Sequence, residues 1–191
     1  MKLLVIDVET TCNDNPSYPR QDVELIEIGC VSCEIKNHEL RVIGKFNEMI
    51  KPTINPLLTP FCKKLLNLEQ ADVERAETID VVLDRFQVWL NGFDPNAWCS
   101  WGKFDKTQFS VECETKKLNN PLGELHHENL KQIFARKRGH RVGMKMALQL
   151  TGLELQGKHH SGLDDAKNIA QIVKHDALIL SALAERIKTK I

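Results

Sequence analysis

The 191-residue sequence lacks a long hydrophobic run, an excess of one charge and an export signal. Its longest apolar stretch near the end, Ala177 to Ala184, is interrupted by Ser181 and is too short to cross a bilayer. At the start, Asp7 interrupts the apolar residues before a secretory segment could form. We therefore expect a cytoplasmic protein whose six cysteines are reduced thiols.

The chain also has no net charge, because 26 Lys and Arg balance 26 Asp and Glu. Proteins that bind nucleic acid mainly through its phosphates are basic overall or on one face. Such binding here must depend on a local patch, and the densest run of cations lies between Lys131 and Arg141. A solvated helix end explains the same run equally well.

A metal-binding cysteine pattern is absent too. Cys30 and Cys33 form a single C-x-x-C without a second pair at zinc-ribbon spacing. They fall in a stretch with strand character, from Leu25 to Ile35, so their odd spacing places the two thiols on opposite faces. We interpret both as small buried hydrophobic residues.

What remains is the composition of an ordinary globular domain, with 42% hydrophobic and 27% charged residues. No internal repeat, low-complexity segment or linker interrupts the sequence. We expect one domain over residues 1–191, with its motifs in about residues 1–175 and a C-terminal helix over residues 176–188.

Hydrophobic patterning predicts strands early in the chain and helices later. Strands are expected at 2–6, 23–35, 40–50 and 96–101, the second and third forming a hairpin. Helices are expected from Thr59-Pro60 onward, over 79–90 with a stop at Gly92, after Gly102, and over 130–137, 144–150 and 163–188 with a break near His175-Asp176. This order predicts an α/β fold with a central mixed sheet flanked by helices.

Carboxylates follow two of the predicted strands. Asp7 and Glu9 stand two residues apart where the first strand ends, so they share a face and repel each other unless a cation lies between them. Hard oxygen ligands of this kind suit Mg²⁺ or Mn²⁺. Asp105 follows a later strand, where α/β proteins place ligands. Taken singly, these residues also fit a solvated strand end or the first turn of a helix.

A third segment with chemical potential runs from His159 to Asn168. His160 precedes Asp165 by five residues across a glycine-containing loop, which can place an imidazole and a carboxylate around one pocket. Ser161 and Asp164 have the spacing of a capping box, which gives Asp164 a structural task. Asp165 points about 100° further round the helix and has no such task. His159 is equally compatible with an exposed position.

Together these segments resemble the DEDDh (DnaQ-like) 3′–5′ exonucleases. Asp7-x-Glu9 is similar to their first motif, Asp105 to the second, and His160 with Asp165 to the third, which has H-x₄-D spacing. The resemblance narrows to the Eri branch of RNA exonucleases and its KapD-type relatives, and spans residues 1 to about 175. It rests on DVETTC at 7–12, ELIEIG at 24–29, TPFCKKL at 59–65, QADV at 70–73, WGKFD at 101–105 and HSGLDDAKNIA at 160–170. Thr10, where Eri proteins usually have Ala, and Glu74, where Asp is common, are departures.

This resemblance implies a ribonuclease H-like (DnaQ-type) fold and metal-dependent removal of nucleotides from a free 3′ end, of RNA more than DNA. It implies two Mg²⁺ per site, with Mn²⁺ as an alternative, about 3.5–4 Å apart. By resemblance, Asp7 bridges the ions, Glu9 and Asp165 hold the ion that binds the attacking water, and Asp105 supports the second ion. His160 takes the proton from that water as general base.

The resemblance also implies that terminal bases stack on aromatic or apolar side chains. Tyr18, the single Tyr, lies in a polar loop, whereas Phe61 and Phe104 also fit core positions of helices. Trp89, Trp98 and Trp101 are expected to be structural. The predicted substrate-binding residues are Thr10, Thr11, Tyr18, Phe61, Phe104 and Asn168.

Two other functions stay open. The same acidic residues would serve a DNA-directed exonuclease, because they contact phosphates and metals and not the 2′-hydroxyl that distinguishes RNA. A non-catalytic RNA-binding scaffold on this fold is the second alternative, although all five catalytic positions are present. The neutral charge predicts a shallow salt dependence of binding. No membrane association is expected, and the sequence identifies no protein partner.

Overall fold

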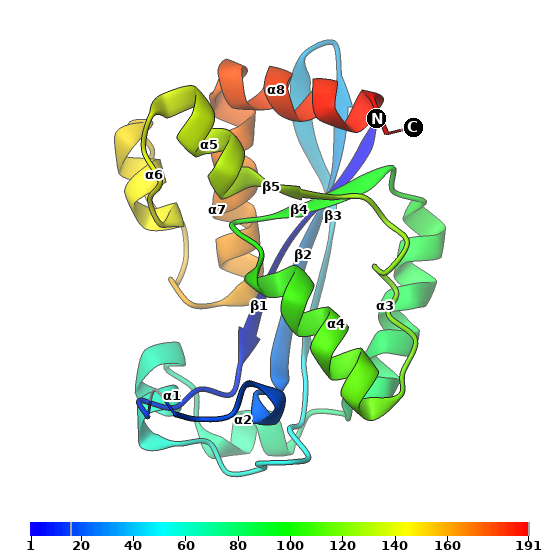
Figure 1. Cartoon of the computed structure of the whole chain (residues 1–191), viewed down its shortest axis with the longest axis vertical. Coiled ribbons are helices and arrows are strands. Elements are labelled where there is room, and N and C mark those ends of the chain that lie inside the picture. Colours follow the sequence, from blue (N-terminus) through cyan, green and yellow to red (C-terminus); the bar gives the residue numbers. More distant parts are fainter. Residues whose placement is uncertain (16, 191) are drawn as a thin grey trace.

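Five strands form one mixed sheet in the computed structural model, which describes residues 1–15 and 17–190 (Figure 1). Pro16, in the segment between the first two predicted strands, and Ile191 lie outside the described residues. The strand order is β3-β2-β1-β4-β5, with antiparallel pairing among the first three and parallel pairing of β1, β4 and β5. The strands span Lys2–Thr10 (β1), Leu25–Lys36 (β2), Glu39–Met49 (β3), Ala97–Ser100 (β4) and His127–Asn129 (β5). The predicted central mixed sheet and its hairpin are confirmed.

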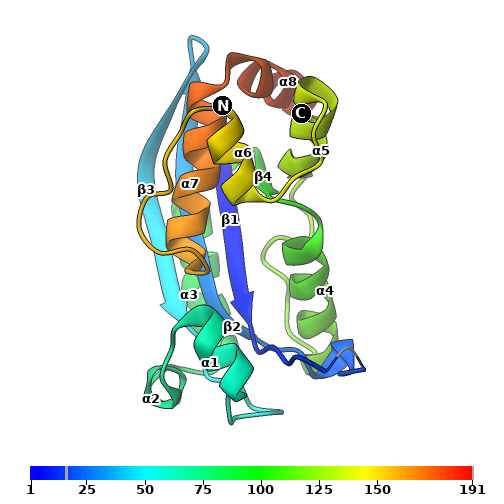
Figure 2. The same cartoon turned by 90° about the vertical axis from the view of Figure 1, so that its left-hand side faces the viewer.

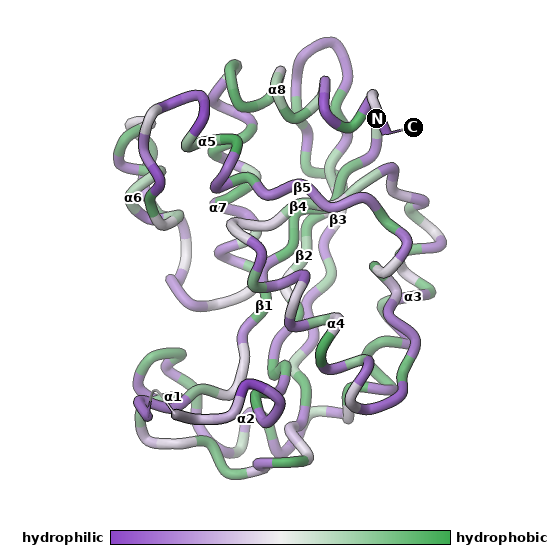
Figure 3. The backbone as a smooth tube through the Cα atoms, viewed as in Figure 1, coloured by the Kyte–Doolittle hydropathy of each residue, from purple (hydrophilic) through white to green (hydrophobic). Residues whose placement is uncertain are grey.

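Helices cover both faces of the sheet, and the alternating residues of β1 divide the core between them. Leu3 and Val5 belong to one hydrophobic cluster and Leu4 and Ile6 to the other. The first cluster includes α5 (Leu130–Arg138), α6 (Met144–Leu150), α7 (Gly162–His175) and α8 (Ala177–Lys188); the second includes α3 (Ile79–Phe93) and α4 (Phe104–Lys116). Figure 2 shows α7 along one face of the sheet with α3 behind it. Hydrophobic and hydrophilic residues alternate in bands along α3 and α4 (Figure 3), as helices with one buried face require.

A smaller cluster closes the end of the sheet where β1 finishes. It joins α1 (Pro60–Leu66) and α2 (Gln70–Glu74) to Ile26 of β2. Thr59 caps α1 through its hydroxyl, which accepts a hydrogen bond from the Cys62 N–H at 3.0 Å, and Pro60 takes the first helical position as predicted. A 3₁₀ turn, η1 (Arg20–Asp22), lies in the loop between β1 and β2.

Most predicted boundaries agree with the structure, but the ends of the first strand and of one helix do not. The first strand, predicted to end at residue 6, continues to Thr10. The break near Asp176 is confirmed, because its carboxylate caps α8 through the N–H groups of Leu178 and Ile179. The predicted stop at Gly92 is wrong: α3 continues to Phe93 and ends at Asp94, whose φ of 54° closes the helix. The three-residue strand β5 was not predicted, because its polar sequence has no periodicity of its own.

The cysteines and two of the tryptophans are structural, as predicted. Cys30 and Cys33 lie in clusters on opposite sides of the sheet, and all six cysteines are free. Trp98 is 1% exposed, and the Trp101 indole N–H donates to the Val142 carbonyl at 3.0 Å. None of the helices in the described chain is long and apolar enough to span a membrane.

Candidate active site

Three carboxylates from β1 and α7 meet at one point. Asp7 and Glu9 continue the face of β1 that Leu3 and Val5 turn toward α7. Asp165, in the first turn of α7, completes the group, and the three residues can bring one ligand oxygen each within 4.8 Å of one another. The predicted side-by-side placement of Asp7 and Glu9 and their convergence with Asp165 are therefore present in the structure.

Two glycines allow α7 to approach the sheet this closely. Gly29 is the register partner of Asp7 on β2, and a Cβ at Gly29 would collide with the backbone of Gly162 and Leu163. A Cβ at Gly162 would lie 2.9 Å from the Asp7 carbonyl oxygen and 3.0 Å from the Gly29 nitrogen. The start of α7 therefore lies directly on the backbone beside Asp7, and this contact brings Asp165 to the two carboxylates of β1.

Asp105 joins the group from the other side of β1. β4 pairs with β1 only as far as Val5, so the Val8 N–H has no strand partner there. The Asp105 carboxylate, at the start of α4, accepts that hydrogen bond at 3.2 Å. The side chain is 5% exposed. Asp105 is thus held on the strand segment between Asp7 and Glu9.

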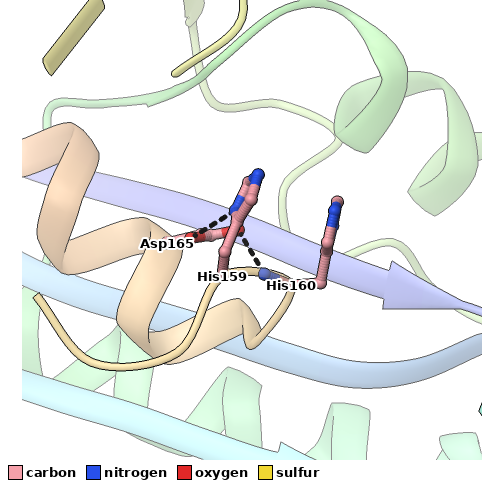
Figure 4. A group of neighbouring side chains, drawn as sticks. All are labelled: His159, His160 and Asp165. Atoms are coloured by element: carbon pink, nitrogen blue, oxygen red, sulfur yellow. Dashed lines mark hydrogen bonds and ion pairs between the residues drawn. The ribbon is translucent and has the colours of Figure 1, made fainter. Parts of the chain in front are cut away.

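The two histidines occupy different positions relative to Asp165 (Figure 4). The His159 ring places Nδ1 3.0 Å from the Asp165 carboxylate, and the His160 ring stacks on it with centroids 4.0 Å apart. His160 has a φ of 63° and contacts Asp165 through its backbone N–H, at 3.0 Å. Within the described chain the His160 ring makes no hydrogen bond. His159 therefore contacts Asp165 through its side chain, although its sequence position was equally compatible with exposure.

Burial and mutual repulsion perturb the acidic groups. Burial raises the pKa of Asp7 well above its ordinary value, and the charges of Asp105, Glu9 and Asp165 raise it further. The pKa of Glu9 is raised to about 8, first by burial and then by the nearby charges, Asp165 foremost. Burial also raises the pKa of Asp105. These shifts indicate a site with excess negative charge.

The described residues supply no Lys or Arg side chain that pairs with these carboxylates. Neither Lys nor Arg among residues 1–15 and 17–190 forms an ion pair with Asp7, Glu9, Asp105 or Asp165. Carboxylate oxygens in a group of this size are the ligands that Mg²⁺ and Mn²⁺ prefer. The donor set therefore fits a divalent cation.

Glu27 is a buried acidic residue that the sequence analysis did not single out. It pairs with Glu9 across β1 and β2, is 5% exposed, and accepts a hydrogen bond from the Gly162 N–H at 3.0 Å. Glu27 thus caps α7, whose N-cap residue Ser161 makes no side-chain capping bond. The predicted capping box is absent: the Asp164 carboxylate instead accepts from the Lys158 N–H at 3.0 Å. The sequence signal that could have identified Glu27 is its position as an acidic residue within an otherwise apolar strand.

Two predicted aromatic side chains are exposed beside the site. Phe61 on α1 is 40% exposed and Phe104, one residue before Asp105, is 45% exposed. The alternative that these rings belong to the core is therefore wrong. Arg20 places its guanidinium carbon 6.0 Å from the centre of the Phe104 ring. Tyr18 is half-buried, and its hydroxyl donates to the Asp22 carbonyl at 3.3 Å.

The polar residues predicted to bind substrate are mostly occupied within the protein. The Asn168 amide is 1% exposed and donates to the carbonyls of Gln156 and Asp164, which contradicts a direct contact with substrate. The Thr11 hydroxyl accepts from the Glu24 N–H at 2.9 Å. Thr10 lies at an irregularity where the pairing of β1 with β2 shifts, and is 9% exposed. Sequence patterns do not separate such interior hydrogen bonds from contacts to a ligand.

Comparison with known proteins gives a family match over most of the chain. The model of an exonuclease family, RNase_T, matches residues 4–173. The chain is 28% identical to 3′-5′ exoribonuclease 1 of Mus musculus over 180 residues and 30% identical to ERI1 exoribonuclease 3 of Homo sapiens over 182 residues. These alignments cover 89% and 90% of this chain but 51% and 52% of those proteins. The chain thus spans about half the length of the curated relatives it matches.

Solved structures give the same answer for the fold. The nuclease domain of 3′hExo, a DEDDh family member bound to rAMP, superposes with a TM-score of 0.83 at 26% identity, covering 95% of this chain and 92% of that one. Cell-death related nuclease 4 superposes with a TM-score of 0.78 at 23% identity, covering 91% and 62%. These matches confirm the predicted ribonuclease H-like fold of the DEDDh type.

Proposed function

The chain belongs to the RNase_T exonuclease family, and from this premise we propose that it is a metal-dependent 3′–5′ exonuclease that acts on RNA. One observation carries the proposal. Asp7, Glu9 and Asp165 can bring ligand oxygens within 4.8 Å of one another, with Asp105 bound to the backbone between the first two. Four carboxylates in this arrangement serve phosphodiester hydrolysis, and they match the motifs of the DEDDh exonucleases.

The acidic residues are proposed to hold divalent cations, and we favour two Mg²⁺ with Mn²⁺ as an alternative. When bound, such ions lower the pKa of the attacking water and stabilise charge on the leaving oxygen. Asp7 lies between the other carboxylates and suits a shared ligand. Glu9 and Asp165 face each other on the α7 side, and Asp105 approaches from the β4 side.

His160 is proposed to accept the proton of the attacking water. Its ring is free of hydrogen bonds within the described chain, and burial, followed by the neighbouring His159, lowers the pKa of His160. The imidazole is therefore neutral at pH 7 and able to accept a proton. His159 contacts the Asp165 carboxylate and is a positioning residue, because its hydrogen bond orients a ligand oxygen.

The terminal nucleotide is proposed to stack on exposed aromatic rings. Phe61 and Phe104 present exposed rings from α1 and from α4, the helix that also carries Asp105. Stacking on such rings tolerates any base and contributes about 1–3 kcal/mol per base. Tyr18, in the loop after β1, is a further candidate for contact with the substrate.

RNA is favoured over DNA because the curated relatives are named exoribonucleases. The catalytic residues themselves do not distinguish the two polymers, so a DNA-directed enzyme is the alternative. The six free cysteines support a cytoplasmic setting. We also propose that residues 1–191 form one exonuclease domain.

Digestion of matched oligonucleotides tests the proposal. RNA and DNA of one sequence, 5′-labelled and carrying single-stranded 3′ ends, are incubated with Mg²⁺, with Mn²⁺ and with EDTA. We expect a ladder that shortens from the 3′ end with either metal, faster for RNA, and no products in EDTA. Faster digestion of DNA would replace the proposed substrate, and tight binding without cleavage would support the scaffold alternative.

A further inference from the structure

A cationic groove opens directly beside the acidic site. It has a volume of about 690 Å³ and is lined by the start of α4 and by α5, which lies above that start in Figure 1. One wall is the segment from Trp101 to Phe104, which ends one residue before Asp105. The other wall is formed by α5 and the loop that follows it. The groove therefore borders the start of α4, the helix that carries Asp105.

Four cations line the groove, and none of them has an acidic partner in the described part of the chain. They are Lys103, Lys131, Arg136 and Arg141, and no ion pair involves any of them. By contrast, Lys116 pairs with Glu24 and Arg138 with Asp176, and no acidic side chain of the described residues lines the groove. The groove therefore concentrates positive charge that the protein itself does not neutralise.

The basic run between Lys131 and Arg141 is thus divided by the fold. Lys131, Arg136 and Arg141 line the groove, whereas Arg138 turns away to the 2.7 Å ion pair with Asp176. Part of this run therefore belongs to the end of a helix, as one of the two interpretations of the sequence predicts, and part lines the groove.

The wall that carries Arg141 is anchored. The Trp101 indole N–H donates to the Val142 carbonyl at 3.0 Å, which ties the loop after α5 to the segment after β4. Gly139, with a φ of 76°, ends α5 and turns the chain into this loop. The two walls are therefore joined by a hydrogen bond that sets the position of the loop bearing Arg141.

We propose that this groove binds the phosphodiester backbone of the substrate strand on the 5′ side of its terminal nucleotide. Backbone phosphates can form ion pairs with the unpaired Lys and Arg side chains of the groove. The exposed Phe104 ring, which also lines the groove, can stack on a base next to the acidic site. The inference rests on the proposed function, because it takes the 3′ end to be at Asp7 and Glu9. The proposal adds a path for the substrate strand, and it predicts that the affinity of the protein for RNA increases as the RNA becomes longer than two nucleotides.

Binding of a labelled 12-nucleotide single-stranded RNA in EDTA, measured by fluorescence anisotropy from 50 to 300 mM KCl, tests the groove without hydrolysis. If all four cations contact phosphates, the slope of log Kd against log salt is about 3, from about 0.7 per contact. The double substitution Lys131→Gln/Arg141→Gln is expected to lower the slope by about 1.4 and weaken binding about tenfold at 100 mM KCl. Unchanged slope and affinity would overturn the proposal.

A matched variant removes two cations from another groove. Lys45 and Lys174 are exposed, form no ion pair in the described chain, and line a hollow between β3 and α7. Lys45→Gln/Lys174→Gln is expected to leave RNA affinity and salt slope unchanged. An equal loss in this variant would show that net charge alone governs binding, which also overturns the groove.

Hydrolysis of short and long substrates separates this inference from the proposed function. Lys131→Gln/Arg141→Gln is expected to lower kcat/KM for the 12-mer about tenfold relative to a dinucleotide, which is too short to occupy the groove. If wild-type protein cleaves neither substrate but the variant loses RNA affinity, the proposed function fails, and of the inference only RNA binding by the groove stands. If wild-type protein trims both and the variant behaves like it, only the groove fails.

Discussion

The molecule contains two buried groups of carboxylates that differ in how their charge is balanced. Glu24 and Glu112 share Lys116, whose Nζ lies 2.8 Å and 3.0 Å from their oxygens. Glu24 also accepts three backbone N–H groups, those of Thr53, Ile54 and Asn55. At the other group, around Asp7 and Glu9, the described chain supplies no Lys or Arg.

The pKa values of Glu24 and Glu9 follow this difference, whereas burial raises the pKa of Glu112 despite its ion pair with Lys116. Burial raises the pKa of Glu24, but the Lys116 hydrogen bond and the N–H groups outweigh it, so the net shift is downward. The pKa of Glu9 is raised to about 8, because burial raises it and the charges of neighbouring carboxylates raise it further. A buried carboxylate with its own cation is neutralised within the fold, which then depends on that cation, whereas carboxylates left without one are available for a divalent ion.

We call the carboxylates around Asp7 and Glu9 the uncompensated group, and the pair Glu24 and Glu112 with Lys116 the compensated group. The largest effect is expected from removing Asp7 from the uncompensated group. Asp7→Ala should abolish 3′-end hydrolysis, a loss of at least about 10³-fold, because Asp7 is the carboxylate on which the charges of Glu9, Asp105 and Asp165 all act. In EDTA the variant should be no less stable than wild type, since repulsion is relieved. Ladder assays and urea unfolding measure both, with Asp80→Asn on the surface of α3 as control. Retained hydrolysis would refute the assignment.

Removing the cation of the compensated group should act on stability instead. Lys116→Ala leaves Glu24 and Glu112 buried without a partner and should lower the free energy of unfolding by about 3–5 kcal/mol. Lys116→Arg keeps the charge and should lose less. Urea unfolding of both variants checks this. Equal stability of Lys116→Ala and wild type would show that the two groups do not differ as described.

A smaller effect is expected where α7 touches the sheet. Gly162→Ala places a Cβ against the Asp7 carbonyl oxygen and the Gly29 nitrogen, so α7 and its carboxylate must shift. We expect a loss of about 1–3 kcal/mol of stability and a larger loss of hydrolysis than of RNA affinity. Gly92→Ala on α3, where nothing lies within 4 Å, is the matched control. Hydrolysis at the wild-type rate in Gly162→Ala would show that this contact does not position Asp165.

How far these features follow from the sequence depends on their range. Asp7 and Glu9 were predictable because a strand places residues two apart on one face. Lys116 and Glu24 are separated by 92 residues and Glu27 and Gly162 by 135. No local pattern shows which carboxylate finds a partner at such distances. The contact of His159 with Asp165 lies next to His160, whose φ is 63°. This backbone conformation cannot be predicted from the residue type.

The smallest effect is a dependence on pH in the absence of metal. In the fold the pKa of Glu9 is about 8, above its ordinary value of 4.5, so the folded protein binds more protons between these values. This contribution to stability is present below pH 4.5 and is lost as pH rises through 8. Glu24, with its lowered pKa, contributes in the opposite direction. Urea unfolding in EDTA at several pH values should show a falling trend that Glu9→Gln reduces and Glu24→Gln does not.

Calorimetric titration of Mn²⁺ into the metal-free protein tests most directly whether the uncompensated carboxylates form a metal site. We expect wild-type protein and Lys116→Arg to bind the ion alike, and Asp7→Asn to lose that binding while remaining folded. Absence of binding to the wild-type protein, or binding that Asp7→Asn leaves unchanged, would contradict the account.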